Sequence, residues 1–182
     1  VIENDANTAQ DIDILLDLLN LHPSDCVLDL CCGQGRHCLE LSKRGYERIV
    51  GLDFSPFLLD LAEKRAKEQG MPVAFKKGDA RNPPFAPNSF DAIICMGNSF
   101  GYFADDKDDL LLIRRIADLM NSGGDVFLDL SDGEVLREKF DPQSREWLDD
   151  QTLVTRERTL SRSGRRLISR EIVYHLETGI LA

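Results

Sequence analysis

The sequence predicts an α/β fold in which a doubly wound, mostly parallel sheet carries helices on both faces and a C-terminal antiparallel β-hairpin follows. Three observations support this prediction. Short apolar runs alternate with helical patterns over residues 8–130, which is typical of a parallel sheet with right-handed crossovers. A glycine-containing turn follows the first apolar run, as it does in nucleotide-binding α/β domains. Near the C-terminus, two β-like runs at 151–160 and 165–176 flank the turn 161–164 and predict the hairpin.

Local sequence patterns place each element of the parallel part. Residues 8–20 carry leucine and isoleucine at helical spacing, which predicts an amphipathic helix. The continuous apolar run at 26–30 suits a central parallel strand that is buried on both faces. Ser55 and Pro56 suit the N-cap and first turn of a helix. In order, we expect a helix at 8–20, a strand at 26–30, a helix up to 43, a strand at 48–52, a helix at 56–69, a strand at 73–76, a strand at 90–95, a helix at 105–120, a turn at 121–124 and a strand at 125–130.

Length and charge limit the class of protein. A chain of 182 residues suggests one domain with a small appendage, which we place as a core at 1–140 and a hairpin extension at 141–182. The net charge of −10 argues against general nucleic-acid binding, which needs clustered Lys and Arg. Residues 151–182 nevertheless hold six Arg and three Glu, a net of +3. No apolar run approaches the length of a membrane span, and no secretory signal is visible.

The five cysteines do not form a disulfide or zinc pattern. Their number is odd, and four of them cluster around one turn. We interpret them as small apolar residues in a reducing cytoplasm, with a redox or metal role as the alternative. The carboxylates at 105–109 suit a helix N-terminus electrostatically, so we expect no metal site there.

The turn at 31–35 admits two interpretations. Dinucleotide-binding domains carry G-x-G-x-x-G, in which the third glycine permits close packing of helix on strand. Here Gly33 and Gly35 fit the first two positions, but Cys38 occupies the third. This difference weakens the interpretation as a nicotinamide dehydrogenase. Asp53, the acid at the end of the second strand, suits either ligand because any ribose offers hydroxyl donors to a carboxylate.

Features further along the chain separate the two interpretations. Asp29 lies inside the first strand, and Asp79 follows the third strand. The run Gly-Asn-Ser-Phe-Gly-Tyr-Phe at 97–103 follows the fourth strand, and two glycines at 123–124 precede the fifth. In this order the chain resembles the class I S-adenosylmethionine-dependent methyltransferases over about residues 10–130. The resemblance implies a Rossmann-like fold that binds S-adenosylmethionine and releases S-adenosylhomocysteine.

The resemblance also implies a role for each matching position. Asp29 and the glycine turn would hold the methionine part of the cofactor, and the backbone at 95–97 would line its amino-acid end. Asp53 would accept from the ribose hydroxyls, and Asp79 from the adenine amino group. The implied cofactor-binding residues are Asp29, Cys32, Gly33, Gly35, Asp53, Phe54, Asp79, Ala80, Cys95, Met96 and Gly97. As alternatives, Asp79 alone would be a turn former and Phe54 alone a core residue. Cys31 stands where the family turn commonly has its first glycine.

Candidates for catalysis lie after the fourth strand and beside the turn. Methyl transfer from a sulfonium is an in-line displacement that depends on orientation and a dry site, and it needs a base only when the acceptor must lose a proton. Asn98 and Tyr102 are the candidates to orient an acceptor. His37 is the candidate base. The alternative is that His37 is a helix-start residue that contacts the cofactor or neighbouring backbone.

The C-terminal hairpin indicates which kind of molecule accepts the methyl group. The hairpin and Glu146-Trp147-Leu148 resemble a β-rich insertion that covers the active site in a subgroup of small-molecule methyltransferases. We therefore expect a small-molecule acceptor. Alternatively, the Arg and aromatic residues of the hairpin would form a solvated face, a homodimer surface or a docking surface for RNA or protein. A further alternative is that the protein binds the cofactor without catalysing a reaction. The family's final strand pair is missing and the chain begins at Val1, so either the sequence is a fragment or the fold ends differently.

Overall fold

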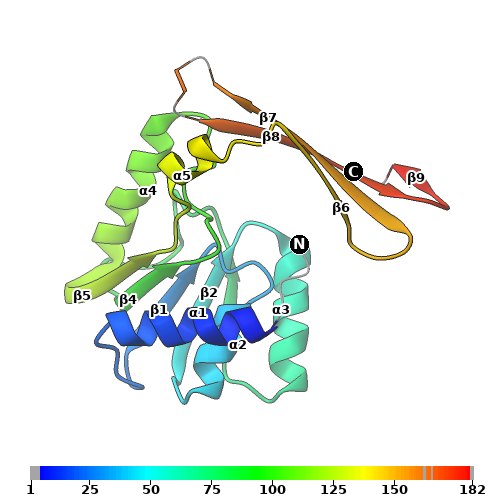
Figure 1. Ribbon diagram of the computed structural model, residues 1–182. Helices are drawn as coiled ribbons and strands as arrows, with labels where there is room; N and C mark the ends of the chain where they lie inside the picture. The colour runs from blue at the N-terminus through cyan, green and yellow to red at the C-terminus, as the bar shows by residue number, and fades with distance from the viewer. Residues whose placement is uncertain (1–4, 162, 165, 181–182) are drawn as a thin grey trace. The chain divides into compact units, whose positions relative to one another are not determined.

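The computed structural model describes residues 5–161, 163–164 and 166–180. These residues form two compact units, one at 5–130 and the other at 131–180. Figure 1 labels their helices and strands. The sequence suggested a boundary at 140/141, whereas the structure divides the chain at 130/131 because the short helix α5 (Gly133–Glu138) groups with the C-terminal strands.

The first unit is built on a five-stranded parallel sheet. Its strands are β1 (Cys26–Leu30), β2 (Arg48–Asp53), β3 (Ala74–Lys77), β4 (Phe90–Cys95) and β5 (Met120–Leu128). Their order is β3-β2-β1-β4-β5, and every neighbouring pair is parallel. This confirms the predicted fold class. The strand order reverses between β1 and β4, and such a switch point is where open α/β sheets bind ligands.

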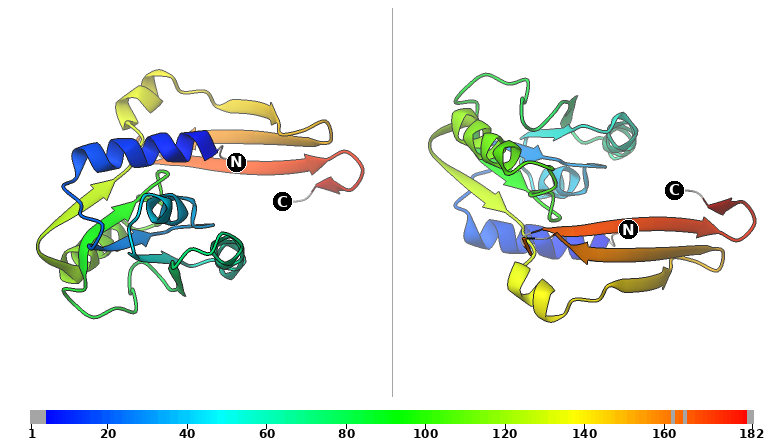
Figure 2. Two further views of the ribbon diagram at one scale, coloured as in Figure 1. Left: turned by 90° about the horizontal axis from the view of Figure 1, so that it is seen from below. Right: turned by 90° about the horizontal axis from the view of Figure 1, so that it is seen from above.

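Helices cover both faces of this sheet. They are α1 (Asp5–Leu18), α2 (Arg36–Lys43), α3 (Pro56–Glu68) and α4 (Asp106–Leu119). Alternate residues of β1 point to opposite faces, so Val27 packs with α1, α2 and α3, whereas Leu28 packs with α4. Figure 2 shows α1 (blue) and α4 (green) on opposite sides of the sheet. The predicted double winding is thus confirmed, and the helices leave the carboxyl ends of the strands available for a site.

Strand β5 differs from its prediction. The sequence suggested a turn at 121–124 and a strand at 125–130, but β5 begins at Met120 and ends at Leu128. Phe90 of β4 pairs with Met120, and Ala92 pairs with Asp125, so two steps along β4 correspond to five along β5. The Ser-Gly-Gly segment that predicted a turn therefore forms a bulge-like irregularity within the strand, with Gly123 at φ 81°.

The second unit is an antiparallel sheet with the order β6-β7-β8-β9. Its strands are β6 (Gln143–Trp147), β7 (Thr152–Leu160), β8 (Leu167–His175) and β9 (Gly179–Ile180). The predicted hairpin is confirmed as the β7–β8 pair. Strand β6 escaped prediction because Gln-Ser-Arg-Glu-Trp has no apolar alternation. Ile168 on β8 is 57% exposed, and Leu176, directly after β8, is 62% exposed.

Candidate cofactor site

The glycine turn begins where β1 ends and leads into α2. Cys31, Gly33 and Gly35 all have positive φ, at 65°, 55° and 76°. A Cβ atom at Gly35 would lie 2.7 Å from the ring of Phe75 on β3, so a side chain there would require this ring to shift. Cys31 stands where the turn of the family that the sequence resembles commonly has its first glycine. Its backbone is nevertheless left-handed, a conformation that is costly for a residue with a Cβ atom.

Asp53 links this turn to the start of α3 through hydrogen bonds. Its Oδ2 accepts a hydrogen bond from Gly33 N at 2.8 Å, and its Oδ1 accepts one from Ser55 N at 2.8 Å. Ser55 in turn caps α3 by accepting from Leu58 N. A carboxylate has about four lone-pair sites, so Asp53 retains acceptor capacity for a ligand after both backbone contacts are made.

Asp29 is a buried acid directly beside the turn. It is 1% exposed, and Cys38 Sγ donates to its Oδ2 at 3.2 Å. Burial raises the pKa of Asp29 to about 7, and the Cys38 hydrogen bond opposes this rise. Its Oδ1 is buried with no hydrogen-bond partner in the described part of the chain. An orphaned buried acceptor is costly, and a ligand donor at this point would satisfy it.

A cavity of about 330 Å³ opens beside the turn, at the carboxyl ends of the strands. Its wall combines aromatic rings, a carboxylate and backbone from the segments that follow β1, β2, β3 and β4. The lining residues are Cys31, Leu52, Phe54, Gly78, Asp79, Ala80, Arg81, Ser99, Tyr102 and Phe103. Phe54 is 73% exposed and Tyr102 is 76% exposed, so both rings are available to a ligand. These features fit the adenosine part of a nucleoside cofactor.

Asp79 is engaged by Arg81 on this wall. Arg81 Nη2 lies 2.6 Å from Asp79 Oδ2, and Arg81 Nη1 lies 2.9 Å from Asp108 Oδ2 at the start of α4. The Arg81 guanidinium also stacks over the ring of Phe103, 4.8 Å from its centroid. Hydrogen bonds from Arg81 hold the pKa of Asp79 below its ordinary value. Arg81 therefore links three segments of the cavity wall.

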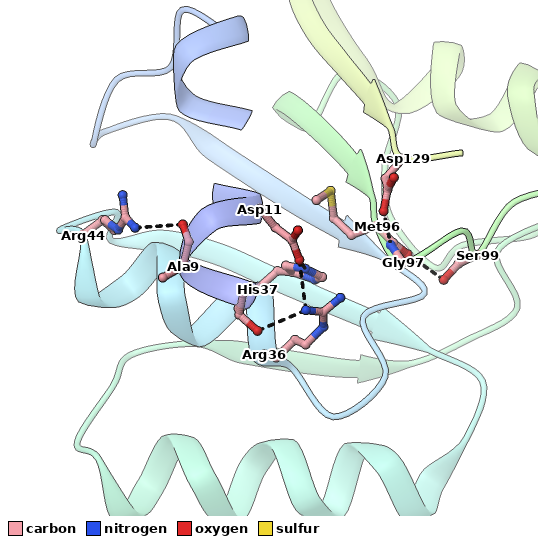
Figure 3. A network of polar contacts seen from close by, with 10 residues as sticks. Ala9, Asp11, Arg36, His37, Arg44, Met96, Gly97, Ser99 and Asp129 are labelled. Carbon is pink, nitrogen blue, oxygen red and sulfur yellow. Dashed lines mark hydrogen bonds and ion pairs between the residues drawn. The ribbon is translucent and has the colours of Figure 1, made fainter. Parts of the chain in front are cut away.

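The end of β4 presents a polar backbone held by Asp129. Gly97 N donates to Asp129 Oδ2 at 2.9 Å, and Asp129 N donates to the carbonyl of Cys95 at 2.9 Å. Ser99 Oγ donates to the carbonyl of Met96 at 2.8 Å, as Figure 3 shows together with the Gly97–Asp129 contact. Cys95 and Met96 are buried, whereas Gly97 is exposed. The backbone at 95–97 is therefore held rigidly next to the turn.

His37 faces α1. Its Nε2 lies 3.3 Å from Asp11 Oδ2, and the same oxygen accepts from Arg36 Nη1 at 3.0 Å. Figure 3 shows Asp11, Arg36 and His37 of this cluster. Arg36 also donates to Thr8 Oγ1. His37 is 4% exposed and is not among the residues that line the cavity. This placement corresponds to a helix-start residue more closely than to a base that meets an acceptor.

The structure brings most of the sequence-derived candidates to one edge of the sheet. Phe54, Asp79, Ala80 and Tyr102 line the cavity itself. Ser99 and Phe103 also line it, and both belong to the run at 97–103 that the sequence singled out. Sequence reasoning missed Arg81, although an arginine two residues after Asp79 was a usable signal for an ion pair. Asn98, the other candidate for orienting an acceptor, has φ 57° and is partly buried beside the cavity residue Ser99.

Comparison with known proteins defines the class. Residues 27–124 match the family described as methyltransferase domain, and this chain belongs to that family. The expected resemblance to class I S-adenosylmethionine-dependent methyltransferases is thereby confirmed. No helix in the described ranges is long and apolar enough to cross a membrane.

Several characterised proteins are similar to this chain. Demethylmenaquinone methyltransferase of Deinococcus radiodurans is 36% identical over 110 residues, which cover 59% of this chain and 43% of that protein. Cypemycin N-terminal methyltransferase of a Streptomyces species is 32% identical over 145 residues, covering 79% of this chain and 58% of that protein. The chain thus spans about half the length of these curated relatives.

Solved structures share the fold. The CcbJ methyltransferase of Streptomyces caelestis matches with a TM-score of 0.82 and 17% identity, covering 98% of this chain and 72% of that one. CalS10 from Micromonospora echinaspora, an amino pentose methyltransferase with S-adenosylmethionine bound, matches with a TM-score of 0.67 and 22% identity, covering 98% and 73%. At these identities the likeness concerns the fold.

Proposed function

We propose that this protein transfers the methyl group of S-adenosylmethionine to a small-molecule acceptor and releases S-adenosylhomocysteine. The observation that carries the proposal is the cavity beside the glycine turn, at the switch point of a methyltransferase-family sheet. A ligand at this position meets the carboxyl ends of four strands at once.

Cavity residues would hold the adenosine part of the cofactor. We assign the ribose hydroxyls to Asp53, which retains acceptor sites beyond its contacts to Gly33 and Ser55. The exposed ring of Phe54 would pack beside the adenine, and the Ala80 backbone and Asp79 would meet its polar edge. This assignment explains why an exposed aromatic ring and a carboxylate line one small cavity.

Residues of the turn would hold the methionine part. The orphaned Oδ1 of Asp29 would accept from the cofactor ammonium group, either directly or through water. Cys32, Gly33 and Gly35 would bring the backbone close to the ligand. The rigid backbone of Cys95, Met96 and Gly97 would line the same end.

The proposed reaction needs little acid–base catalysis by the protein. The sulfonium of the cofactor supplies an activated methyl group for in-line displacement. Asn98 and Tyr102 would orient the acceptor nucleophile over the end of β4, and the aromatic wall would exclude water. His37 would act by holding α2 against α1 through Asp11, since it does not line the cavity.

Charge pairing in the second unit favours a small acceptor over RNA. Arg156 lies 2.7 Å from Glu146 and 2.5 Å from Glu171, so its charge is balanced within the sheet. Two structural neighbours described as an amino pentose and a sugar N-methyltransferase are consistent with this choice. The exposed Trp147 would suit a homodimer contact. The five free thiols support a reducing compartment such as the cytoplasm.

Calorimetry with S-adenosylhomocysteine tests cofactor binding. Wild type should bind, and Asp53→Asn should lose about tenfold or more in affinity because an amide cannot replace a carboxylate acceptor for two hydroxyls. Asp60→Asn on the exposed face of α3 is the matched control and should bind like wild type. Failure of the wild-type chain to bind would refute the proposal.

Turnover must be tested separately from binding, because one structural neighbour is described as a [4+2]-cyclase. Release of S-adenosylhomocysteine should be measured with panels of small amines, hydroxyl compounds and quinol-like carbon acids. Binding without release on any acceptor, including RNA and peptide N-termini, would favour the non-catalytic alternative.

A further inference from the structure

Four of the five cysteines form two thiol pairs around the glycine turn. Cys32 and Cys38 form the first pair, which lies in the core between the sheet and α2. Cys31 and Cys95 form the second pair, which lies on the opposite face, toward α4. Each pair joins the turn to a neighbouring element, so a covalent link in either pair would restrain the turn.

Strand pairing brings Cys31 and Cys95 to neighbouring positions at the ends of β1 and β4. Strands β1 and β4 are parallel neighbours in which Asp29 is opposite Ile94, so Cys95 lies beside the residue that precedes Cys31. Neighbouring strands lie about 4.8 Å apart, and disulfides join Cα atoms about 4.4–6.8 Å apart. Cys31 also packs against the hydrophobic cluster that contains Cys95. The two thiols therefore lie at neighbouring strand ends and pack in one cluster, which suits a disulfide between them.

Only the second pair has a thiol on the cavity wall. Cys31 lines the cavity and is partly exposed, whereas Cys32 and Cys38 are buried. The interaction between the two neighbouring thiols lowers the pKa of Cys31 and raises that of Cys95. A thiolate is the form that reacts with oxidants, so Cys31 is the reactive member and Cys95 is placed as the resolving thiol.

We propose that Cys31 and Cys95 form a redox-modification site, at which a hydroperoxide converts the two thiols to a disulfide. The sulfur of Cys31 attacks the peroxide, so that its S–O bond forms, the O–O bond breaks and an alcohol or water leaves. The sulfur of Cys95 then displaces the hydroxyl from Cys31. The S–S bond forms, the S–O bond breaks, and the Cys95 proton leaves with the hydroxyl as water. The peroxide is reduced and the two thiols are oxidised.

The consequence for ligand binding rests on the proposed function. Cys31 immediately precedes the segment that would hold the methionine end of the cofactor, so the disulfide fixes this part of the turn in one geometry. It also joins the turn to the end of β4, across the place where the ligand must pass. Oxidation should therefore weaken cofactor binding, and bound cofactor should shield Cys31 from peroxide.

Peptide mapping of the full chain tests the site itself. The reduced protein is treated with hydrogen peroxide, alkylated and digested without reductant. The expected product is a Cys31–Cys95 linked peptide that dithiothreitol removes. Cys26→Ser, at the opposite end of β1, should give the same product, while Cys31→Gly and Cys95→Ser should give none. Cys31→Gly keeps the test sound if Cys95→Ser fails to fold. A Cys32–Cys38 link, a sulfinic acid at Cys31 without a link, or unreacted thiols would each overturn the inference.

Calorimetry then separates this inference from the proposed function. Oxidised protein should bind S-adenosylhomocysteine at least about tenfold more weakly than reduced protein, with recovery after dithiothreitol. Cys31→Gly should show no change on peroxide treatment. If reduced wild type does not bind at all, the proposed function fails, while the mapped disulfide still decides the redox site. Unchanged binding by protein with a mapped disulfide would overturn the predicted effect on the turn.

Discussion

Arg81 donates hydrogen bonds to both carboxylate oxygens of Asp79. The Arg81 backbone N and Nε lie 2.9 and 3.0 Å from Asp79 Oδ1, while Nε and Nη2 lie 3.1 and 2.6 Å from Oδ2. Nε carries one hydrogen that both oxygens share, so three N–H groups of Arg81 occupy most of the roughly four acceptor sites of this carboxylate. The acid that the sequence assigns to the adenine amino group is therefore already engaged, and a ligand donor competes with Arg81 for it.

This competition predicts that Arg81→Met strengthens binding of S-adenosylhomocysteine by severalfold, because Asp79 no longer has to release a partner. Calorimetry measures the change. Arg115→Met, which removes the exposed pair with Asp118 on α4, is the matched control and should leave affinity unchanged. Weaker binding by Arg81→Met would mean that Arg81 instead positions Asp79 for the ligand.

The backbone of Cys31 predicts a stabilising substitution. Its φ of 65° costs a residue with a Cβ atom about 1–2 kcal/mol relative to glycine. Cys31→Gly should therefore raise the free energy of unfolding, by at most about 1 kcal/mol after the lost side-chain contacts and the larger entropy of the unfolded chain are subtracted. Urea denaturation measures this difference. The same change at Cys26, within the extended strand β1, should destabilise the protein.

Alanine substitutions at Gly35 and Gly45 distinguish the cost of backbone strain from the cost of steric overlap. Both have positive φ, at 76° and 91°, but a Cβ atom at Gly35 would lie 2.7 Å from Phe75, whereas at Gly45 it would meet nothing within 4 Å. Alanine at Gly45 should cost about 1 kcal/mol from φ alone, and alanine at Gly35 should cost at least about 1 kcal/mol more. Equal losses in urea denaturation would show that Phe75 moves aside freely.

The buried acid Asp29 predicts a pH-dependent stability. Its pKa of about 7 in the folded protein exceeds the value near 3.9 expected in the unfolded chain, so the folded state keeps a proton that the unfolded state loses. The free energy of unfolding should fall as pH rises from about 4 to about 7 and should then level off. The loss should be on the order of a few kcal/mol.

Asp29→Asn should remove this contribution, so the variant should gain stability relative to wild type across the same interval. Urea denaturation at pH 5 and pH 8 provides the comparison. Asp60→Asn on the exposed side of α3 should follow the wild-type pH dependence. Parallel curves for Asp29→Asn and wild type would contradict a raised pKa.

The strands of the parallel sheet could be predicted to different degrees for physical reasons. Strands β1 and β4 fall at the predicted residues because continuous apolar runs bounded by turns have few alternatives. Strand β5 carries Ser-Gly-Gly, whose local preference for a turn is overridden by pairing with β4. Strand β9 spans two residues, too few for any periodic pattern.

The contacts of the candidate site also differ in how far the sequence could predict them. Asp53 and Gly33 were predictable as neighbours, because strand ends of a parallel sheet meet at one edge. That the Asp53 carboxylate accepts from the Gly33 backbone depends on the turn's dihedral angles, which no residue pattern specifies. Similarly, Arg81 could be seen in the sequence, but its choice of Asp79 and Asp108 as partners required the start of α4 to be placed beside it.

The ring of Phe75 limits which residues can occupy positions 35 and 51. A Cβ atom would lie 2.7 Å from this ring at Gly35 in the turn and also at Gly51 in β2. A smaller side chain at position 75 would remove the closest contact at both positions, while Cys32 Sγ at 2.8 Å from a Cβ atom at Gly51 and Ala62 Cβ at 3.0 Å from one at Gly35 would remain. The tolerance of either glycine to mutation therefore depends in part on a residue in another strand. Homologues with alanine at one of these glycines should therefore carry a smaller residue at position 75, and redesign of the turn has to begin from β3.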